Sequence, residues 1–145
     1  MRVSTQFPIA VHIMLMIDAF PDLKITSDVL AESAGCNPVI IRGVFANLRN
    51  AGLLETKSGR GKTTVTRPAE DITLWDIYTA VESDAPDALF KLHPNTSKTC
   101  VVGSNIHALL MPHLEDAAAA IKESFSRVTL AELKEALYAK ITERG

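Results

Sequence analysis

The residues with the clearest chemical purpose are cationic side chains gathered between positions 36 and 67. They are Arg42, Arg49, Lys57, Arg60, Lys62 and Arg67. The same stretch holds only one acidic residue, Glu55, so its net charge is six minus one, or +5. The whole chain carries −2, so the rest of the chain carries −7. A basic island on an acidic protein is the pattern expected of a surface that binds phosphate groups.

Two helices joined by a tight turn are expected to position these cations. Thr26 or Ser27 can cap the first helix, and Gly35 supplies the unusual backbone angle of the turn. Asn37 and Pro38 start the second helix, because asparagine caps free backbone N–H groups and proline has no N–H to leave unpaired. The helix ends at Ala51-Gly52, since glycine accepts the left-handed conformation that follows a helix. The sequence thus predicts a helix-turn-helix.

The second helix is expected to read DNA bases. Val39, Val44 and Leu48, with the isoleucines at 40 and 41 beside them, follow the spacing of an apolar stripe. Arg42 and Arg49 fall largely off that stripe, and arginine is the commonest reader of guanine in the major groove. The residues predicted to enter the major groove are Asn37, Pro38, Val39 and Arg42.

A basic hairpin is predicted directly after this helix. Residues 53–57 begin apolar and then alternate, residues 58–62 form a glycine-rich turn, and residues 63–66 are mostly β-branched. Helix, turn and hairpin in this order indicate a winged helix-turn-helix. The residues predicted to hold phosphates are Arg49, Lys57, Ser58, Arg60, Lys62 and Thr63, with Arg60 also able to reach the minor groove. A winged-helix module that binds proteins and no DNA is the alternative.

Composition narrows the function classes. At 145 residues and 47% hydrophobic, the chain suits one domain with an appended dimerisation element, and its 6% aromatic content leaves little for base-stacking platforms. Two distant cysteines make no disulfide framework, and no apolar run reaches the length of a membrane span, so we expect a cytoplasmic protein. The chain shows no nucleophile–base arrangement, phosphate loop or zinc signature, so we predict no enzyme.

Two further helices flank this unit. The first, from Ser4 or Thr5 to about Phe20, is apolar on nearly all sides and is expected to be buried between its own domain and a partner. Another, capped by Asp71 or Thr73, runs to residue 82. It carries Trp75, the only tryptophan, which would lie in the core, at a dimer interface or beside an effector pocket.

A long helix is predicted over residues 104–128, with a kink or break at Pro112. About 25 residues at ~1.5 Å each give roughly 37 Å, which is long for a domain of this size unless the helix crosses a dimer interface. A last helix begins at Thr129. The apolar seam expected at the dimer interface comprises Ile106, Leu110, Leu114, Ala117, Ile121 and Phe125.

Cys100 lies just ahead of the long helix. A helix N-terminus favours the thiolate, which would suit a redox or electrophile switch, whereas free cysteine is also commonly a small buried hydrophobe. His93, His107 and His113 lie nearby, but their spacing matches no metal-binding motif. We therefore predict no metal site, and Cys36, in the helix-turn-helix turn, is expected to serve packing.

The segments NPVIIR, LRNAGLL and PAEDITLWDIYTAVE, with CVVG at residues 100–103, carry a family resemblance. The chain resembles the Rrf2 family of bacterial winged-helix regulators, of the IscR, NsrR and CymR type, and above all its YwnA-like branch. The resemblance implies a homodimer with a long C-terminal dimerisation helix, bound to a palindromic operator in double-stranded DNA. It also places a sensing region before that helix, around Trp75 and Cys100.

The chain departs from the iron–sulfur members of that family. Those members carry three clustered cysteines ahead of the long helix, because a cluster needs several thiolates within bonding distance, and here Cys100 stands alone. We therefore expect no cofactor, and a redox or small-molecule signal. The sequence predicts a mainly α, dimeric repressor with a small β wing. Its predicted parts are a winged-helix domain (1–82), a connecting and sensing region (83–103) and dimerisation helices (104–145).

Overall fold

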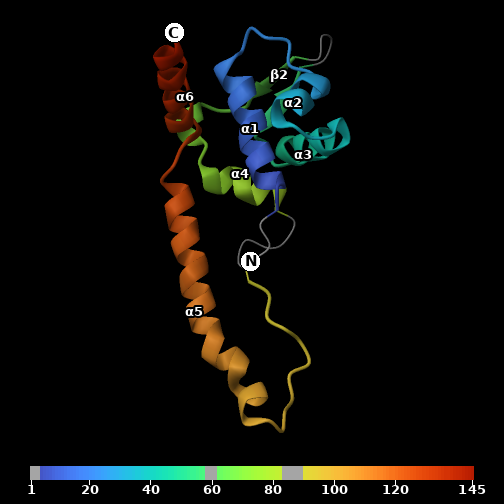
Figure 1. Ribbon diagram of the computed structural model, residues 1–145, viewed down its shortest axis with the longest axis vertical. Helices are drawn as coiled ribbons and strands as arrows, with labels where there is room; N and C mark the ends of the chain where they lie inside the picture. Colours follow the sequence, from blue (N-terminus) through green and yellow to red (C-terminus); the bar gives the residue numbers. More distant parts are fainter. Residues whose placement is uncertain (1–3, 58–61, 83–89) are drawn as a thin grey trace.

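The computed structural model describes residues 4–57, 62–82 and 90–145 and confirms a mainly helical chain with a small antiparallel sheet (Figure 1). Its elements are α1 (Gln6–Ala19), α2 (Ser27–Ala34), α3 (Pro38–Asn50), β1 (Leu54–Thr56), β2 (Thr63–Val65), the 3-10 turn η1 (Ala69–Asp71), α4 (Leu74–Val81), α5 (Val101–Ser126) and α6 (Leu130–Arg144). None of the helices in these segments is both long and apolar enough to cross a membrane.

Helix α1 occupies the centre of the body, which explains its apolar surface. Ala10, Ile13 and Met14 are fully buried, and α1 contacts α2, α3, α4, α6 and β2. The expected partner chain is therefore not needed to cover this helix, because elements of its own chain surround it. Figure 1 shows α1 between α6 on one side and α2 and α3 on the other.

The predicted caps of the helix-turn-helix are confirmed. The Thr26 hydroxyl accepts a hydrogen bond from the Val29 N–H at 3.2 Å, and Asn37 Oδ1 accepts one from the Val39 N–H at 2.8 Å. Pro38 occupies the first helical position, and Gly35 adopts a left-handed φ of 67° at the end of α2. These local bonds fix where α3 begins and how it leaves α2.

The buried stripe of α3 differs in phase from the predicted one. Ile41, Val44 and Leu48 face the core, whereas Val39 is 65% exposed. Val39 lies in the first turn of the helix, beyond the reach of the core that the later turns contact, so its position on the stripe was predicted wrongly. Its exposure agrees with its other predicted role, on the outward face.

The wing is a two-stranded hairpin anchored on α3. Gly52, with φ of 78°, ends the helical segment, and the buried pair Leu53 and Leu54 ties the first strand to the core. Strand β1 pairs with β2 so that Leu54 lies opposite Val65, and the Thr66 hydroxyl donates to the Gly52 carbonyl at 2.6 Å. The wing is thus held at its base by both strands.

Helices α4 and α6 begin side by side. Thr73 caps α4 in a capping box with Asp76, Thr129 caps α6, and the two threonines form an isolated antiparallel bridge. Leu130, the first residue of α6, is fully buried in the same core as Ile72. The predicted division into residues 1–82, 83–103 and 104–145 stays a prediction, and the structure packs α6 on the first of these parts.

Helix α5 runs away from the body and has no buried residue (Figure 1). It begins at Val101, earlier than expected, because the Ser97 hydroxyl accepts the N–H groups of Thr99 and Cys100 and so organises the turn before it. Pro112 lies inside the helix without ending it, so of the two predicted outcomes the break does not occur and the kink stays a prediction. The N-terminal half of α5 therefore exposes apolar side chains, whereas Phe125 near its C-terminal end packs on the body.

Candidate nucleic-acid interface

The N-terminal half of α3 presents the residues predicted to read bases. Asn37, Val39 and Arg42 are exposed, and Pro38 is half-buried at the start of the helix. The side-chain oxygen of Asn37, Oδ1, accepts the hydrogen bond that caps α3, so the side-chain NH2 group is the part that could reach a base. The buried side of the same helix is anchored by Ile41 and Leu48, so this outward face is rigidly held.

The residues predicted to bind phosphates lie around this face. Arg49 is exposed in the last turn of α3. Lys57 and Lys62 sit opposite each other at the end of the hairpin, where the Lys57 N–H donates to the Lys62 carbonyl at 3.2 Å. Thr63 follows, half-buried, with its hydroxyl 3.2 Å from that of Thr56. Ser58 and Arg60, also predicted contacts, lie outside the described residues.

Arg67 has a different role from the one its charge suggested. Its guanidinium Nη2 lies 3.0 Å from Asp76 Oδ2, and the same carboxylate oxygen accepts the Thr73 N–H at 2.9 Å. Both side chains of the ion pair are more than one-third exposed, so the pair contributes little stability. It nevertheless links the exit of the wing to the cap of α4, which charge counting alone did not reveal.

Trp75 belongs to an aromatic cluster where α5 meets the body. Its ring stacks on Tyr78 with centroids 5.3 Å apart, and Lys122 Nζ lies 5.9 Å from the Trp75 centroid. Phe7 from α1 stacks on Phe125 from α5 at 5.3 Å, and both rings contact Tyr78. The cluster joins three helices, so Trp75 is placed at the junction between the winged-helix body and α5.

Cys100 stands at the opposite end of α5 from this cluster. The helix has 26 residues, which at ~1.5 Å each separates its ends by roughly 39 Å. The structure therefore does not bring Trp75 and Cys100 together within one chain, although both were predicted to sense. The missing signal was the long-range path of the chain, which residue spacing does not encode.

The Cys100 thiol is exposed on the described chain. Backbone hydrogen bonds from Gly103 and then Val102 lower the pKa of this thiol from its ordinary value. Cys36 is half-buried and packs against the core, as predicted, and both cysteines are free thiols. The geometry thus makes Cys100 the more accessible of the two for chemistry.

The histidines serve local contacts. His12 Nε2 lies 2.7 Å from the Ser33 hydroxyl, within hydrogen-bond distance. His107 Nε2 lies 2.9 Å from the His93 carbonyl oxygen, and the two rings meet edge to face. Within the described ranges, no group of three or more His, Cys, Asp or Glu residues is arranged to hold a metal ion.

The predicted apolar seam of α5 is only part of the apolar surface of the helix. Five of the six seam residues are half-buried and Leu110 is exposed. Sequence reasoning missed the more exposed apolar side chains, including Val101 at 79% and Leu109 at 63%. The uninterrupted runs at 101–102 and 109–111 were the signal, because a helix with one apolar face does not place adjacent residues on it. The residues added to the predicted seam are Val101, Val102, Leu109 and Met111.

An asparagine-capped helix with exposed Val39 and Arg42, followed by a basic hairpin on a helical body, defines the winged helix-turn-helix class of DNA-binding proteins. The sequence profile of the Rrf2 family, described as an iron-dependent transcriptional regulator, matches residues 3–136. The chain therefore belongs to the Rrf2 family of transcription regulators, and double-stranded DNA is the partner that this family supports.

Individual relatives agree with this assignment. YwnA of Bacillus subtilis, named as an HTH-type transcriptional regulator, is 26% identical over 136 residues, covering 94% of this chain and 99% of YwnA. A transcriptional regulator of Lactobacillus plantarum superposes with a TM-score of 0.75 at 26% identity, covering 92% of this chain and 90% of its own. CymR, the global cysteine regulator of B. subtilis, shares the fold, with a TM-score of 0.68 at 19% identity over 93% of this chain and 97% of CymR.

The iron in the family description does not fit an iron–sulfur cluster held by the cysteines of this chain. A cluster needs several thiolates, and the chain has two cysteines, one in the turn before α3 and one before α5.

Proposed function

We propose that this protein is a homodimeric repressor that binds a palindromic operator. Helix α3 of each protomer enters the major groove, and the wing holds the neighbouring backbone. The observation that carries the proposal is the two-sided packing of α3, which buries Ile41 and Leu48 while exposing Val39 and Arg42 beside a basic hairpin. Bound RNA polymerase would compete with a repressor for an operator that overlaps a promoter.

The division of roles follows from geometry and side-chain chemistry. Arg42 projects from the exposed face of α3 and can donate two hydrogen bonds to one guanine, which specifies a base. Arg49, Lys57, Lys62 and Thr63 lie around it and contact phosphates, which gives affinity and register without sequence preference. For Ser58 and Arg60 the same phosphate-binding role is proposed from the sequence alone.

Dimerisation is supported by the surface of α5. The helix has 26 residues, none of them buried, and it displays exposed valine, leucine and methionine side chains along its N-terminal half. A monomer would leave this continuous apolar surface in water. A second copy of the same helix would cover it, and the resulting two-fold symmetry would match two half-sites of a palindrome about one helical turn apart.

A thiol-reactive signal is the best-supported input. Cys100 is exposed, its pKa is lowered by backbone N–H groups, and it sits at the start of the proposed dimerisation helix. Oxidation or alkylation there would change how two α5 helices meet and so the distance between the two recognition helices. A small molecule at the aromatic cluster around Trp75 is the second candidate, because that cluster joins α4 to α5. We expect these events in the cytoplasm.

Light scattering and a gel shift on DNA from upstream of its own gene test the proposal. We expect a dimer mass at micromolar concentration and a retarded band that weakens between 50 and 200 mM salt, by roughly a thousandfold or more if six or more phosphates are contacted. A monomer mass where DNA is still bound would contradict the dimer. Absence of any retarded band would instead favour the protein-interaction module.

The same assay tests the signal. Oxidant should lower operator affinity, reductant should restore it, and the Cys100→Ser variant should not respond. Cys36→Ser serves as the matched control, because its thiol is half-buried in the turn, and it should respond like wild type. A Cys100→Ser protein that still loses affinity with oxidant would move the signal away from this thiol.

A further inference from the structure

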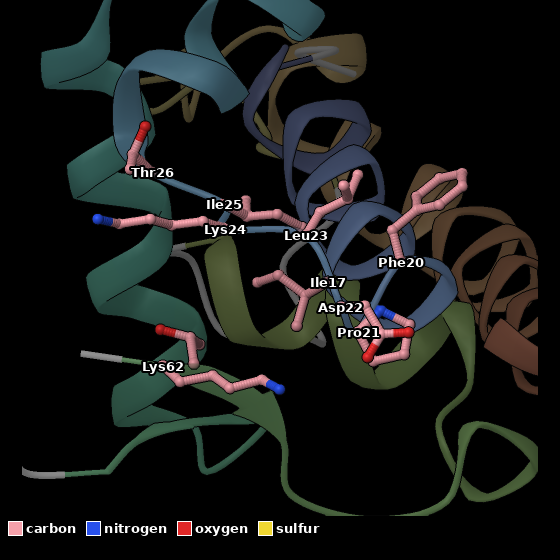
Figure 2. Close-up of a pocket in the computed structure, with 10 residues that line it drawn as sticks. Ile17, Phe20, Pro21, Asp22, Leu23, Lys24, Ile25, Thr26 and Lys62 are labelled. Atoms are coloured by element: carbon pink, nitrogen blue, oxygen red, sulfur yellow. The ribbon is translucent and has the colours of Figure 1, made fainter. Parts of the chain in front are cut away.

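A cavity of about 650 Å³ lies between the α1–α2 connection and the start of β2 (Figure 2). Its inner wall is apolar, with Ile17 nearly fully buried, and its rim carries two lysines and one aspartate. Figure 1 shows the α1–α2 connection, α2 and β2 at the same end of the body. The lining residues are Ile17, Phe20, Pro21, Asp22, Leu23, Lys24, Ile25, Thr26, Lys62 and Thr63.

The charged rim is built from two separate parts of the chain. Lys24 belongs to the connection before α2 and Lys62 to the start of β2, and both are exposed. In Figure 2 the Lys24 side chain lies above and the Lys62 side chain below, with Ile17 at a height between them, and the two amino groups point to opposite sides of the view. Two cations set apart in this way suit an extended anion better than one small ion held at a single point.

Two neutral residues that line the cavity, Thr63 and Thr26, can also donate hydrogen bonds. The hydrogen bonds from Lys57 N–H to the Lys62 carbonyl and from Thr66 N–H to the Leu53 carbonyl fix which residues of β2 pair with β1. Thr63 and its partner Thr56 then form a non-hydrogen-bonded pair of the sheet, so the Thr63 N–H points away from β1, toward the free edge. The Thr26 oxygen accepts the capping bond of α2, which leaves its hydroxyl hydrogen able to donate.

We propose that this cavity receives the sugar-phosphate backbone of the operator, which makes Lys24 a DNA-binding residue that no motif indicated. The inference rests on the proposed DNA-binding function and extends its surface past the wing. Lys24 and Lys62 bind phosphates from the two sides of the cavity, and the Thr63 N–H contributes a neutral hydrogen bond. Asp22 also lines the cavity, and its negative charge repels the phosphates and therefore limits the affinity for DNA.

The salt dependence of operator binding tests this placement. Removing one lysine–phosphate interaction reduces the slope of log K against log salt by about 0.9, which at 0.1 M salt corresponds to roughly an eightfold drop in affinity. Lys24→Ala should therefore reduce the slope by about 0.9 per half-site and weaken all DNA sequences alike. Asp22→Asn should strengthen binding at low salt. Lys140→Ala is the matched control, because this exposed lysine lies on α6, across the body from α2 and α3 (Figure 1), and its slope should equal that of wild type.

The outcomes separate this inference from the function on which it rests. If wild type binds DNA and Lys62→Ala reduces the slope, but Lys24→Ala behaves like Lys140→Ala, only the cavity assignment is overturned. If wild type binds no DNA, both are overturned. A parallel titration of the 15N-labelled protein with inorganic phosphate, against chloride at equal ionic strength, distinguishes a free anion. Shifts at Thr63 and Lys24 together with unchanged DNA binding by Lys24→Ala would show a free-anion site and overturn the DNA assignment.

Discussion

Truncation of Leu130 tests whether the last helix is part of the winged-helix core. Leu130 is fully buried, its N–H donates to the Ile72 carbonyl at 2.8 Å, and the neighbouring Leu74 N–H donates to the Val128 carbonyl at 2.9 Å. Leu130→Ala removes three buried carbons, which at about 0.8 kcal/mol each amounts to about 2.4 kcal/mol. The cavity left behind raises the expected loss of unfolding free energy to about 3–4 kcal/mol.

Urea unfolding at one fixed protomer concentration measures this loss, because a dimer's apparent stability depends on concentration. The midpoint should fall without a change in slope, and the melting temperature should drop by roughly 9–12 °C, taking about 3 °C per kcal/mol for a domain of this size. Ile141→Ala is the matched control. Its side chain is 48% exposed near the end of the same helix, so its truncation should cost less than about 1 kcal/mol.

The result that refutes this reasoning is a Leu130→Ala protein as stable as the Ile141→Ala protein. Such an outcome would mean that α6 is not packed on α1 and η1 in solution. A second readout guards against loss of folding altogether. Because Leu130 lies at the start of α6 and Arg42 on α3, the folded fraction of Leu130→Ala should bind operator DNA with the affinity of wild type at low temperature.

Four further substitutions test the DNA interface, the turn before Cys100 and one ion pair. Arg42→Ala should cost about 1–3 kcal/mol of operator binding and relax preference at one base pair per half-site, whereas Lys62→Ala should weaken all sequences alike. Fluorescence anisotropy on single-base-pair operator variants separates the two, and uniform weakening by Arg42→Ala would make it a phosphate contact. Gly103→Ala would place a Cβ 2.7 Å from the Ser97 carbonyl oxygen, so the turn before α5 must shift. The backbone hydrogen bonds that lower the pKa of Cys100 would then weaken, and the pH profile of Cys100 alkylation should move to higher pH. An unchanged profile would contradict this. Lys134→Gln should cost about 1 kcal/mol at neutral pH, because it leaves a largely buried carboxylate on α1 without its ion-pair partner at 2.8 Å. A hydrogen bond to that carboxylate raises the pKa of Lys134. The ion pair therefore stabilises the fold fully below the ordinary lysine pKa, and this stabilisation is lost as the pH rises through the raised pKa. If the urea midpoints of wild type and Lys134→Gln still differ in strong alkali, the ion pair is not the source of the stability difference.

The sequence by itself determined the features that depend on neighbours within one helical turn. Thr26, Asn37, Thr73 and Thr129 cap the helices that they were expected to cap, because a capping bond joins a side chain to an N–H only two or three residues away. Gly52 follows the end of α3 for the same local reason, as its positive φ shows. The order of helix, turn and wing followed directly from these signals, and with it the class of protein.

The tertiary structure decided which of these local pieces meet. Nothing in the spacing of Arg67 and Asp76 shows that the wing exit is tied to the cap of α4, because that contact depends on how the chain turns between them. Likewise, the apolar residues on all sides of α1 indicated that the helix is buried, but not which elements cover it. The structure shows that elements of the same chain cover it. Leu130 looked like part of a dimerisation element until the bridge beside it placed it in the core.

The separation of Trp75 and Cys100 shows the same limit for the candidate sensing residues. Each was identified from its own residue type and immediate setting. Cys100 lies at the start of the long helix, as expected, whereas the stacking of Trp75 on Tyr78 was found only in the structure. Whether two such residues share a site depends on the direction of α5. Cys100 lies at the N-terminal end of this 26-residue helix, and Trp75 lies near its C-terminal end. Local chemistry is set by a few adjacent residues, whereas the meeting of distant residues is set by the burial of apolar surface across the whole chain.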